Sequence, residues 1–161
     1  MLIFAVSSCL LGNPVRYDGR AKPEPSIIDA SEYRWVPICP ECGCGMPVPR
    51  PPIHRRGARL TGADGRGDWS DVMRQLIAAE TARLRSLGVC GAVLKSRSPS
   101  CGVTDTPLFD DAGRPAGFGA GFFAEGLRTA WPELPIIDEN GWRDPEKRAE
   151  FLSAACNFPI M

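Results

Sequence analysis

The chain has a single histidine, no excess charge of either sign and no long apolar run. Its 19 Lys and Arg balance its 19 Asp and Glu, which argues against a protein that coats nucleic acid, so we expect no stable nucleic-acid complex. No segment approaches the roughly 18 consecutive apolar residues of a membrane span, so no membrane partner is expected. The N-terminus lacks the basic region of a secretory signal, and we expect a cytoplasmic protein.

The composition is that of an ordinary globular protein apart from its glycine and proline. With 161 residues, 43% of them apolar and 24% charged, we expect a single domain over residues 1–161. Glycine (17) and proline (16) make up about a fifth of the chain, against roughly 12% in average proteins. Long, shaped loops are therefore expected.

Short apolar runs alternate with helical patterns along the chain. Buried strands are predicted at 2–6, 35–38, 89–94 and 135–138. Helices are predicted between an N-cap at Asp68 and a C-cap at Gly88, at 118–130 and at 145–156. Residues 40–67 are predicted to be almost all loop. Strands that alternate with helices indicate an α/β sandwich with a mostly parallel sheet.

Seven cysteines in a chain without a secretory signal are typical of ligands, nucleophiles or core residues rather than disulfides. Cys9, Cys39 and Cys101 each follow a predicted strand. Because the carboxyl ends of parallel strands lie along one edge of a sheet, we expect these three residues to converge in space. Cys90 and Cys156 are interpreted as small buried hydrophobic residues.

Converging thiols can hold a metal or form a redox pair. Three thiolates from separate loops suit a four-iron cluster with one open iron, which is a Lewis acid. A non-catalytic zinc-binding domain would instead use Cys39, Cys42 and Cys44 with Cys9 or Cys101, although the chain offers only one CxxC pair. A thiol redox protein would use Cys39 and Cys42 at a helix N-terminus, yet the glycines and prolines that follow are not typical of a helix.

Polar residues beside these cysteines suggest a reactive site. Glu41 lies two residues from Cys39, which suits an acid or base. Ser98 and Ser100 flank Pro99 just before Cys101 and could hydrogen-bond a sulfur atom or a substrate.

Basic residues are concentrated in the same loops. Nine of the 19 Lys and Arg lie there: Arg16, Arg20, Lys22, Arg50, Arg55, Arg56, Arg59, Lys95 and Arg97. Such a rim would attract an anionic group such as a phosphate. We expect Lys95, Arg55 and Arg56 to contribute to substrate binding, together with Ser98.

Three segments together resemble the signatures of the thiouracil desulfidase family. The first comprises residues 7–12 (SSCLLG) and 15–19 (VRYDG), the second residues 39–41 (CPE) and 45–50 (GMPVPR), and the third residues 94–102 (LKSRSPSCG). They occur in the family's order, and the similarity extends over about residues 3–140. The chain departs from the pattern by carrying Cys42 and Cys44 beside Cys39, so either could replace Cys39 as a ligand or close the fourth iron.

The resemblance implies a Rossmann-like α/β domain with a [4Fe-4S] cluster held by Cys9, Cys39 and Cys101. It implies an enzyme that converts thiolated uracil, its nucleoside or its nucleotide (the 2-thiouracil or 4-thiouridine type) to the oxo form and releases hydrogen sulfide. The thiocarbonyl sulfur would bind the open iron, and water activated by Glu41 would attack the ring carbon with no net redox change. Ser100 is assigned to the catalytic set with Glu41.

Overall fold

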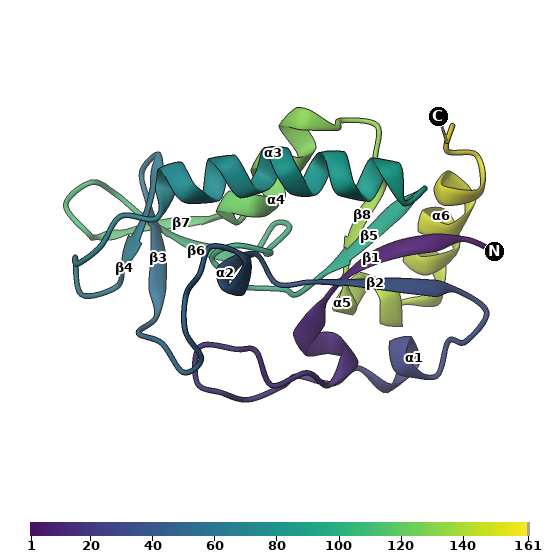
Figure 1. The fold of residues 1–161 in the computed structure, drawn as a ribbon, viewed down its shortest axis with the longest axis horizontal. Coiled ribbons are helices and arrows are strands. Elements are labelled where there is room, and N and C mark those ends of the chain that lie inside the picture. The colour runs from purple at the N-terminus through teal and green to yellow at the C-terminus, as the bar shows by residue number, and fades with distance from the viewer. Residues whose placement is uncertain (161) are drawn as a thin grey trace.

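A computed structural model describes residues 1–160 and contains a parallel sheet, sheet A, in the half of the molecule where the two ends of the chain lie (Figure 1). Its strands are β1 (Ile3–Ser7), β2 (Arg34–Ile38), β5 (Gly91–Leu94) and β8 (Ile136–Asp138), and they pair in the order β2-β1-β5-β8. All three pairings are parallel. The four predicted strands and the α/β class are therefore confirmed.

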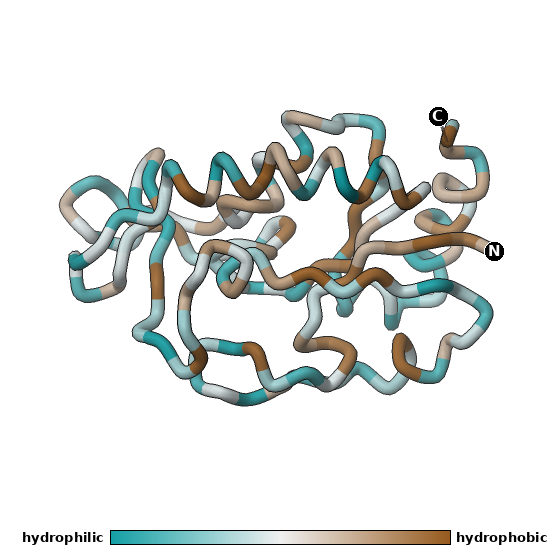
Figure 2. The backbone as a smooth tube through the Cα atoms, in the orientation of Figure 1, coloured by the Kyte–Doolittle hydropathy of each residue, from teal (hydrophilic) through white to brown (hydrophobic). Residues whose placement is uncertain are grey.

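The two faces of sheet A bury different side chains because successive residues of a strand point to opposite sides. In β1, Ala5 belongs to the core cluster shared with Leu84 and Leu127 of the helices on one face. Phe4 and Val6 belong to a second cluster, with Trp142 on the other face. Figure 2 shows a hydrophobic segment, β1, running inward from the N-terminus.

Helices cover both faces of sheet A and complete the sandwich (Figure 1). They are η1 (Ser8–Leu11, a 3-10 turn), α1 (Pro25–Ile28), α2 (Pro40–Gly43), α3 (Ser70–Ser86), α4 (Phe122–Ala130), α5 (Glu139–Arg143) and α6 (Pro145–Cys156). Helix α3 begins where Asp68 accepts a hydrogen bond from the Ser70 amide (2.9 Å), and Gly88 follows its end with a positive φ of 75°. None of the helices among the described residues has the length and apolar character needed to cross a membrane.

A second sheet, sheet B, was not predicted. Its strands are β3 (Ile53–Arg56), β4 (Arg59–Gly62), β6 (Thr106–Phe109) and β7 (Pro115–Gly119), in the order β4-β3-β6-β7. The loop prediction for 40–67 is therefore wrong at α2 and at the β3–β4 hairpin. The predicted helix at 118–130 is also too long, because 118–119 end β7 and the helix starts at Phe122.

The physical reason for these errors is that sheet B is short and largely polar. Strand β3 reads Ile-His-Arg-Arg and β7 contains two glycines, so neither shows the apolar pattern of a buried strand. The chain turns between β3 and β4 at Gly57, whose φ is +57°. Sheet B therefore depends on tertiary contacts, with Ile53 and Leu60 in the same core cluster as α3 and α4.

Candidate active site

A cavity of about 520 Å³ lies at the carboxyl edge of sheet A, with part of sheet B in its wall. Its volume falls in the range of small-molecule sites, roughly 300–1,000 Å³. In the register of β1 and β2, Ser7 lies opposite Ile38, so the two strands end at the same level. The segments after β1, β2 and β5 therefore open into one space, as expected for a parallel sheet.

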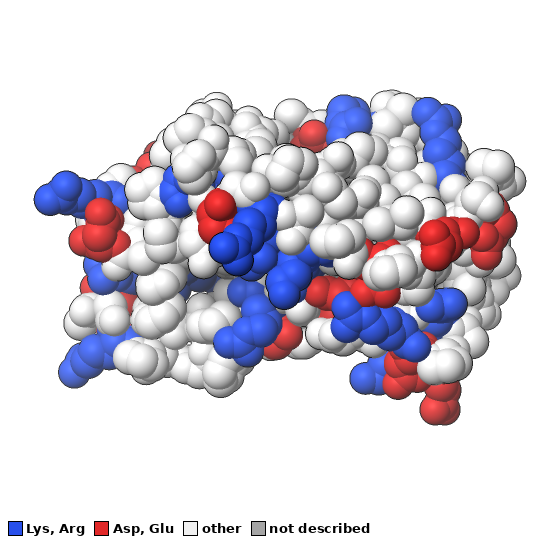
Figure 3. Space-filling model, turned by 90° about the horizontal axis from the view of Figure 1, so that it is seen from below, with Lys and Arg blue, Asp and Glu red and all other residues white. Residues whose placement is uncertain are grey.

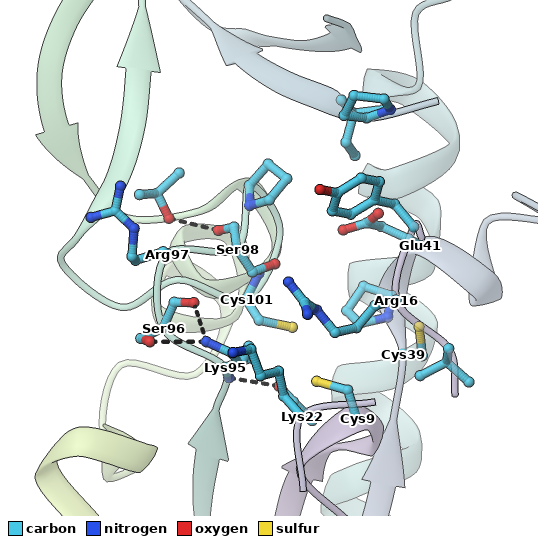
Figure 4. Close-up of a pocket in the computed structure, with 18 of the residues that line it drawn as sticks. Cys9, Arg16, Lys22, Cys39, Glu41, Lys95, Ser96, Arg97, Ser98 and Cys101 are labelled. Atoms are coloured by element: carbon cyan, nitrogen blue, oxygen red, sulfur yellow. Dashed lines mark hydrogen bonds between the residues drawn. The ribbon is translucent and has the colours of Figure 1, made fainter. Parts of the chain in front are cut away.

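Cys9, Cys39 and Cys101 all line this cavity. Cys9 lies in η1 directly after β1, Cys39 follows β2, and Cys101 lies in the loop after β5. Cys9 and Cys101 are buried, while Cys39 is half-buried. In Figure 4 the sulfur atoms of Cys9 and Cys101 point toward one another, and the Arg16 side chain extends in among the three cysteines. The structure thus brings together three thiols that are far apart in the sequence.

Burial is the largest influence on the pKa values of these three thiols, and it raises them. It raises the pKa of Cys9, an effect that the charges of Lys95 and Arg16 partly offset. Burial also raises the pKa of Cys39 to about 12, and that of Cys101 far above its usual range. A redox-active CxxC cysteine has a lowered pKa, so the raised pKa of Cys39 does not favour a thiol redox pair at this CxxC. The sequence argument against that pair is wrong in one respect, because the short helix α2 does follow Cys39.

The other cysteines are not among the residues that line the cavity. The Cys44 thiol is buried against the Met73 sulfur (3.7 Å), and the Cys42 thiol faces the Val15 carbonyl oxygen (3.9 Å). Cys90 is buried as predicted, but Cys156 is exposed, because it lies on the solvent side of α6. Within residues 1–160, no three His, Cys, Asp or Glu side chains are gathered closely enough to hold one metal ion. This arrangement does not favour the zinc-binding alternative.

Glu41 lies in the first turn of α2 and lines the cavity. Its Oε1 accepts a hydrogen bond from Arg50 Nε (3.0 Å), and its Oε2 accepts one from the Ser100 hydroxyl (3.0 Å). Both donors are buried, with exposed fractions of 8% for Arg50 and 1% for Ser100. The carboxylate is therefore held from two sides by residues that the chain supplies from different loops.

The loop that carries Ser100 is fixed by its own hydrogen bonds and by α4. The Ser98 hydroxyl oxygen accepts hydrogen bonds from the amides of Ser100 (3.2 Å) and Cys101 (2.9 Å). The Ser100 carbonyl oxygen accepts one from the Ala124 amide in α4 (3.0 Å). Gly121 allows this approach, since a Cβ there would lie 2.5 Å from the Ser100 carbonyl oxygen.

Lys95 lines the cavity, but its ammonium already has polar partners within the protein. Its ammonium donates to the carbonyl (2.9 Å) and hydroxyl (3.1 Å) oxygens of Ser96 and forms an ion pair with Glu139 (2.8 Å). Glu139 is buried at the end of β8, and sequence analysis did not identify it. The signal that could have found it is its position after the fourth strand of the sheet, at the same edge as the cysteines.

The basic rim is only partly the one expected from the sequence. Lysine and arginine gather near the centre of the face shown in Figure 3. The basic residues that line the cavity are Arg16, Lys22, Arg50, Lys95 and Arg97, whereas Arg55 and Arg56 are not among its lining residues. Arg55 instead forms an ion pair with Glu125 and donates a hydrogen bond to the Ala120 carbonyl oxygen (2.6 Å). A role for Arg55 and Arg56 in substrate binding remains a prediction.

Sheet B contributes an aromatic pair to the cavity wall. The rings of His54 and Phe109 are stacked, with their centroids 4.1 Å apart and their planes inclined by 8°. Burial and the charge of Arg56 lower the pKa of His54, so its imidazole is neutral at pH 7. Arg97 has a φ of +63°, a conformation that is uncommon outside glycine and frequent at functional sites, and its guanidinium lies 5.9 Å from the centre of the Phe118 ring.

Fold and site together define an α/β protein with a thiol-lined, carboxylate-bearing cavity at the edge of a parallel sheet. Comparison with protein families then gives its family: the 2-thiouracil desulfurase model matches residues 4–139, and the chain belongs to that family. The chain is also similar to the solved structure of the [4Fe-4S]-dependent thiouracil desulfidase TudS. The two are 28% identical with a TM-score of 0.76, and the match covers 93% of this chain and 99% of that one. No curated protein sequence matches the chain.

Proposed function

We propose that this protein is an iron–sulfur-dependent desulfidase that converts thiolated uracil, its nucleoside or its nucleotide to the oxo form. The reaction exchanges a C=S bond for a C=O bond with one water molecule and releases hydrogen sulfide. The observation that carries the proposal is the convergence of Cys9, Cys39 and Cys101 on one cavity that also holds Glu41. Membership of the desulfurase family and the likeness to TudS support it.

The donor set fits a [4Fe-4S] cluster held by these three cysteines. Each cysteine of such a cluster ligates a different iron, so its thiols are spread around a volume rather than gathered on one ion. This agrees with three thiols lining a cavity without forming a site for a single metal ion among residues 1–160. When bound, the cluster supplies a Lewis-acid iron without a protein ligand, where a thiocarbonyl sulfur can coordinate.

The chain's own residues then supply the water chemistry. Glu41 lines the cavity and would take a proton from a water molecule there as that water attacks the ring carbon. Ser100 donates a hydrogen bond to Glu41, and this contact supports a role for Ser100 in orienting the carboxylate. Glu41 returns this proton to the departing sulfur, and the second proton of the water leaves the added hydroxyl as the C=O bond forms and completes hydrogen sulfide. Atoms and charge therefore balance without an oxidant or reductant.

A phosphate on the substrate would meet three cationic side chains at the cavity wall. Arg16, Lys22 and Arg97 all line it. Within residues 1–160 the Arg16 guanidinium has only a 4.0 Å ion pair with Asp18, and the Arg97 guanidinium contacts only the Phe118 ring. These cations can bind an anion with little loss of existing contacts, in contrast to Lys95. Lys95 and Ser98 remain candidates for contacts to the ring.

Activity itself is the first test. Protein purified and reconstituted anaerobically is incubated with 2-thiouracil, 4-thiouridine or 4-thiouridine 5′-monophosphate. We expect loss of thiocarbonyl absorbance and one equivalent of sulfide for each oxo product. Cluster-loaded protein that converts none of the three substrates would reject the proposed function.

The phosphate contact is tested separately with Arg97→Gln. We expect its KM for 4-thiouridine 5′-monophosphate to rise by about tenfold, which corresponds to loss of one charge-assisted hydrogen bond, while its KM for the free base stays unchanged. Equal losses on the nucleotide and the base would reject a phosphate-binding role for Arg97.

A further inference from the structure

Arg50 connects the loops that form one side of the cavity. Its guanidinium donates to Glu41 Oε1 (3.0 Å), to the Val15 carbonyl oxygen (2.9 Å) and to the Pro47 carbonyl oxygen (3.3 Å). It also contacts the Cys42 sulfur (3.8 Å). Its backbone amide donates to the Tyr17 carbonyl oxygen (2.8 Å). The side chain of Arg50 is only 5% exposed. One buried guanidinium thus links the segment after β1 to the segment after β2.

The contacts of Arg50 fix the direction of the Glu41 carboxylate. A carboxylate offers about four lone-pair sites on its two oxygens. Arg50 uses a site on Oε1 and Ser100 uses a site on Oε2, so the carboxylate can no longer rotate freely. Since Glu41 still lines the cavity, its remaining sites are available to a water molecule there.

From this geometry we propose that Arg50 is a positioning residue that aims the Glu41 carboxylate at the reacting water. The inference rests on the proposed function and extends it to a residue outside the assigned catalytic set. Three oxygen acceptors in three directions require the planar fork of a guanidinium, which a lysine ammonium cannot reproduce. Misplacing a reacting group by about 1 Å can cost roughly 100-fold in rate, so loss of this contact should act on kcat.

The first test compares Arg50→Lys and Arg50→Ala with the wild-type enzyme, using whichever thiolated pyrimidine the wild type converts. Activities are expressed per bound cluster, from the iron and sulfide content of each preparation. We expect kcat to fall by about 10- to 100-fold in both variants with KM within about twofold of wild type. Millimolar guanidinium should restore part of the kcat of Arg50→Ala, and an equal concentration of sodium chloride should not.

A purely structural role would give a different pattern. Arg143 serves as the matched control because its guanidinium pairs with the buried Glu24, away from the residues that line the cavity. Arg143→Lys should lower thermal stability without changing kcat per cluster. If Arg50→Lys keeps a kcat within twofold of wild type, the proposal is overturned, and this holds even if Arg50→Ala does not fold.

A double substitution tests whether Arg50 acts through Glu41. Adding Arg50→Lys to Glu41→Gln should lower the residual single-turnover rate no further, because the two residues act as one unit. A further loss as large as that seen in the wild-type background would overturn the proposal. Inactivity of the wild type itself would instead reject the proposed function, so the two failures are distinguishable.

Discussion

Glu41 is the residue on which the proposed chemistry depends most directly. It is the carboxylate that lines the cavity while its two oxygens accept hydrogen bonds from Arg50 and Ser100. Glu41→Gln keeps the size of the side chain but cannot take a proton. We expect kcat to fall by about 100- to 10,000-fold while the cluster absorbance is unchanged.

The control for this substitution is Glu80→Gln. Glu80 pairs with Arg83 on the surface of α3, so the Glu80→Gln variant should have the activity of the wild type. Full activity in Glu41→Gln would show that another group activates the water.

His54 makes stability depend on pH. Its folded pKa lies below the unfolded value of about 6.5 because burial and Arg56 disfavour the charged ring. Below that pH the unfolded chain binds a proton that the folded chain does not. The free energy of unfolding therefore decreases as the pH is lowered, until the folded pKa is reached. Relative to His54→Gln, the wild type should lose thermal stability as the pH falls through about 6.5. If the thermal unfolding midpoints of the two proteins change equally with pH, this prediction is wrong.

Secondary-structure elements bring the site together, and their predictability follows from their burial. Each strand of sheet A contains an apolar run, although β2 begins with Arg34 and β8 ends at Asp138. The sequence pattern therefore locates these strands and implies that Cys9, Cys39 and Cys101 converge. Sheet B is held by tertiary contacts and leaves no such pattern. The contribution of His54 and Phe109 to the cavity wall therefore could not be predicted. The partners of Arg50 and Lys95 also depend on loop geometry that no local pattern specifies.

The positions of β2 and α2 determine which of Cys39, Cys42 and Cys44 lines the cavity. Cys39 lines it, whereas Cys44 packs against Met73 and Cys42 faces the Val15 carbonyl. We expect Cys39→Ser to lose most of its iron and sulfide, with Cys42→Ser and Cys44→Ser keeping theirs. Iron content after identical anaerobic reconstitution is the measurement. Loss of iron in Cys42→Ser but not in Cys39→Ser would reassign the ligand.

At the scale of the whole molecule, the two sheets share one core. Leu60 of β4 is fully buried in the cluster that also contains Met73 of α3 and Ala5 of β1. We therefore propose that the chain unfolds as one domain. Leu60→Ala should destabilise the entire molecule by about 2–5 kcal/mol, in a single transition. Two separate transitions, with only one shifted in the variant, would contradict a shared core.

The proposed function depends on a catalytic iron–sulfur cluster held by Cys9, Cys39 and Cys101. Its most direct test is the iron, acid-labile sulfide and zinc content of anaerobically purified protein, measured beside Cys101→Ser. We expect about four irons and four sulfides per chain in the wild type, and loss of both in the variant. Stoichiometric zinc without iron, even after anaerobic reconstitution, would contradict the claim.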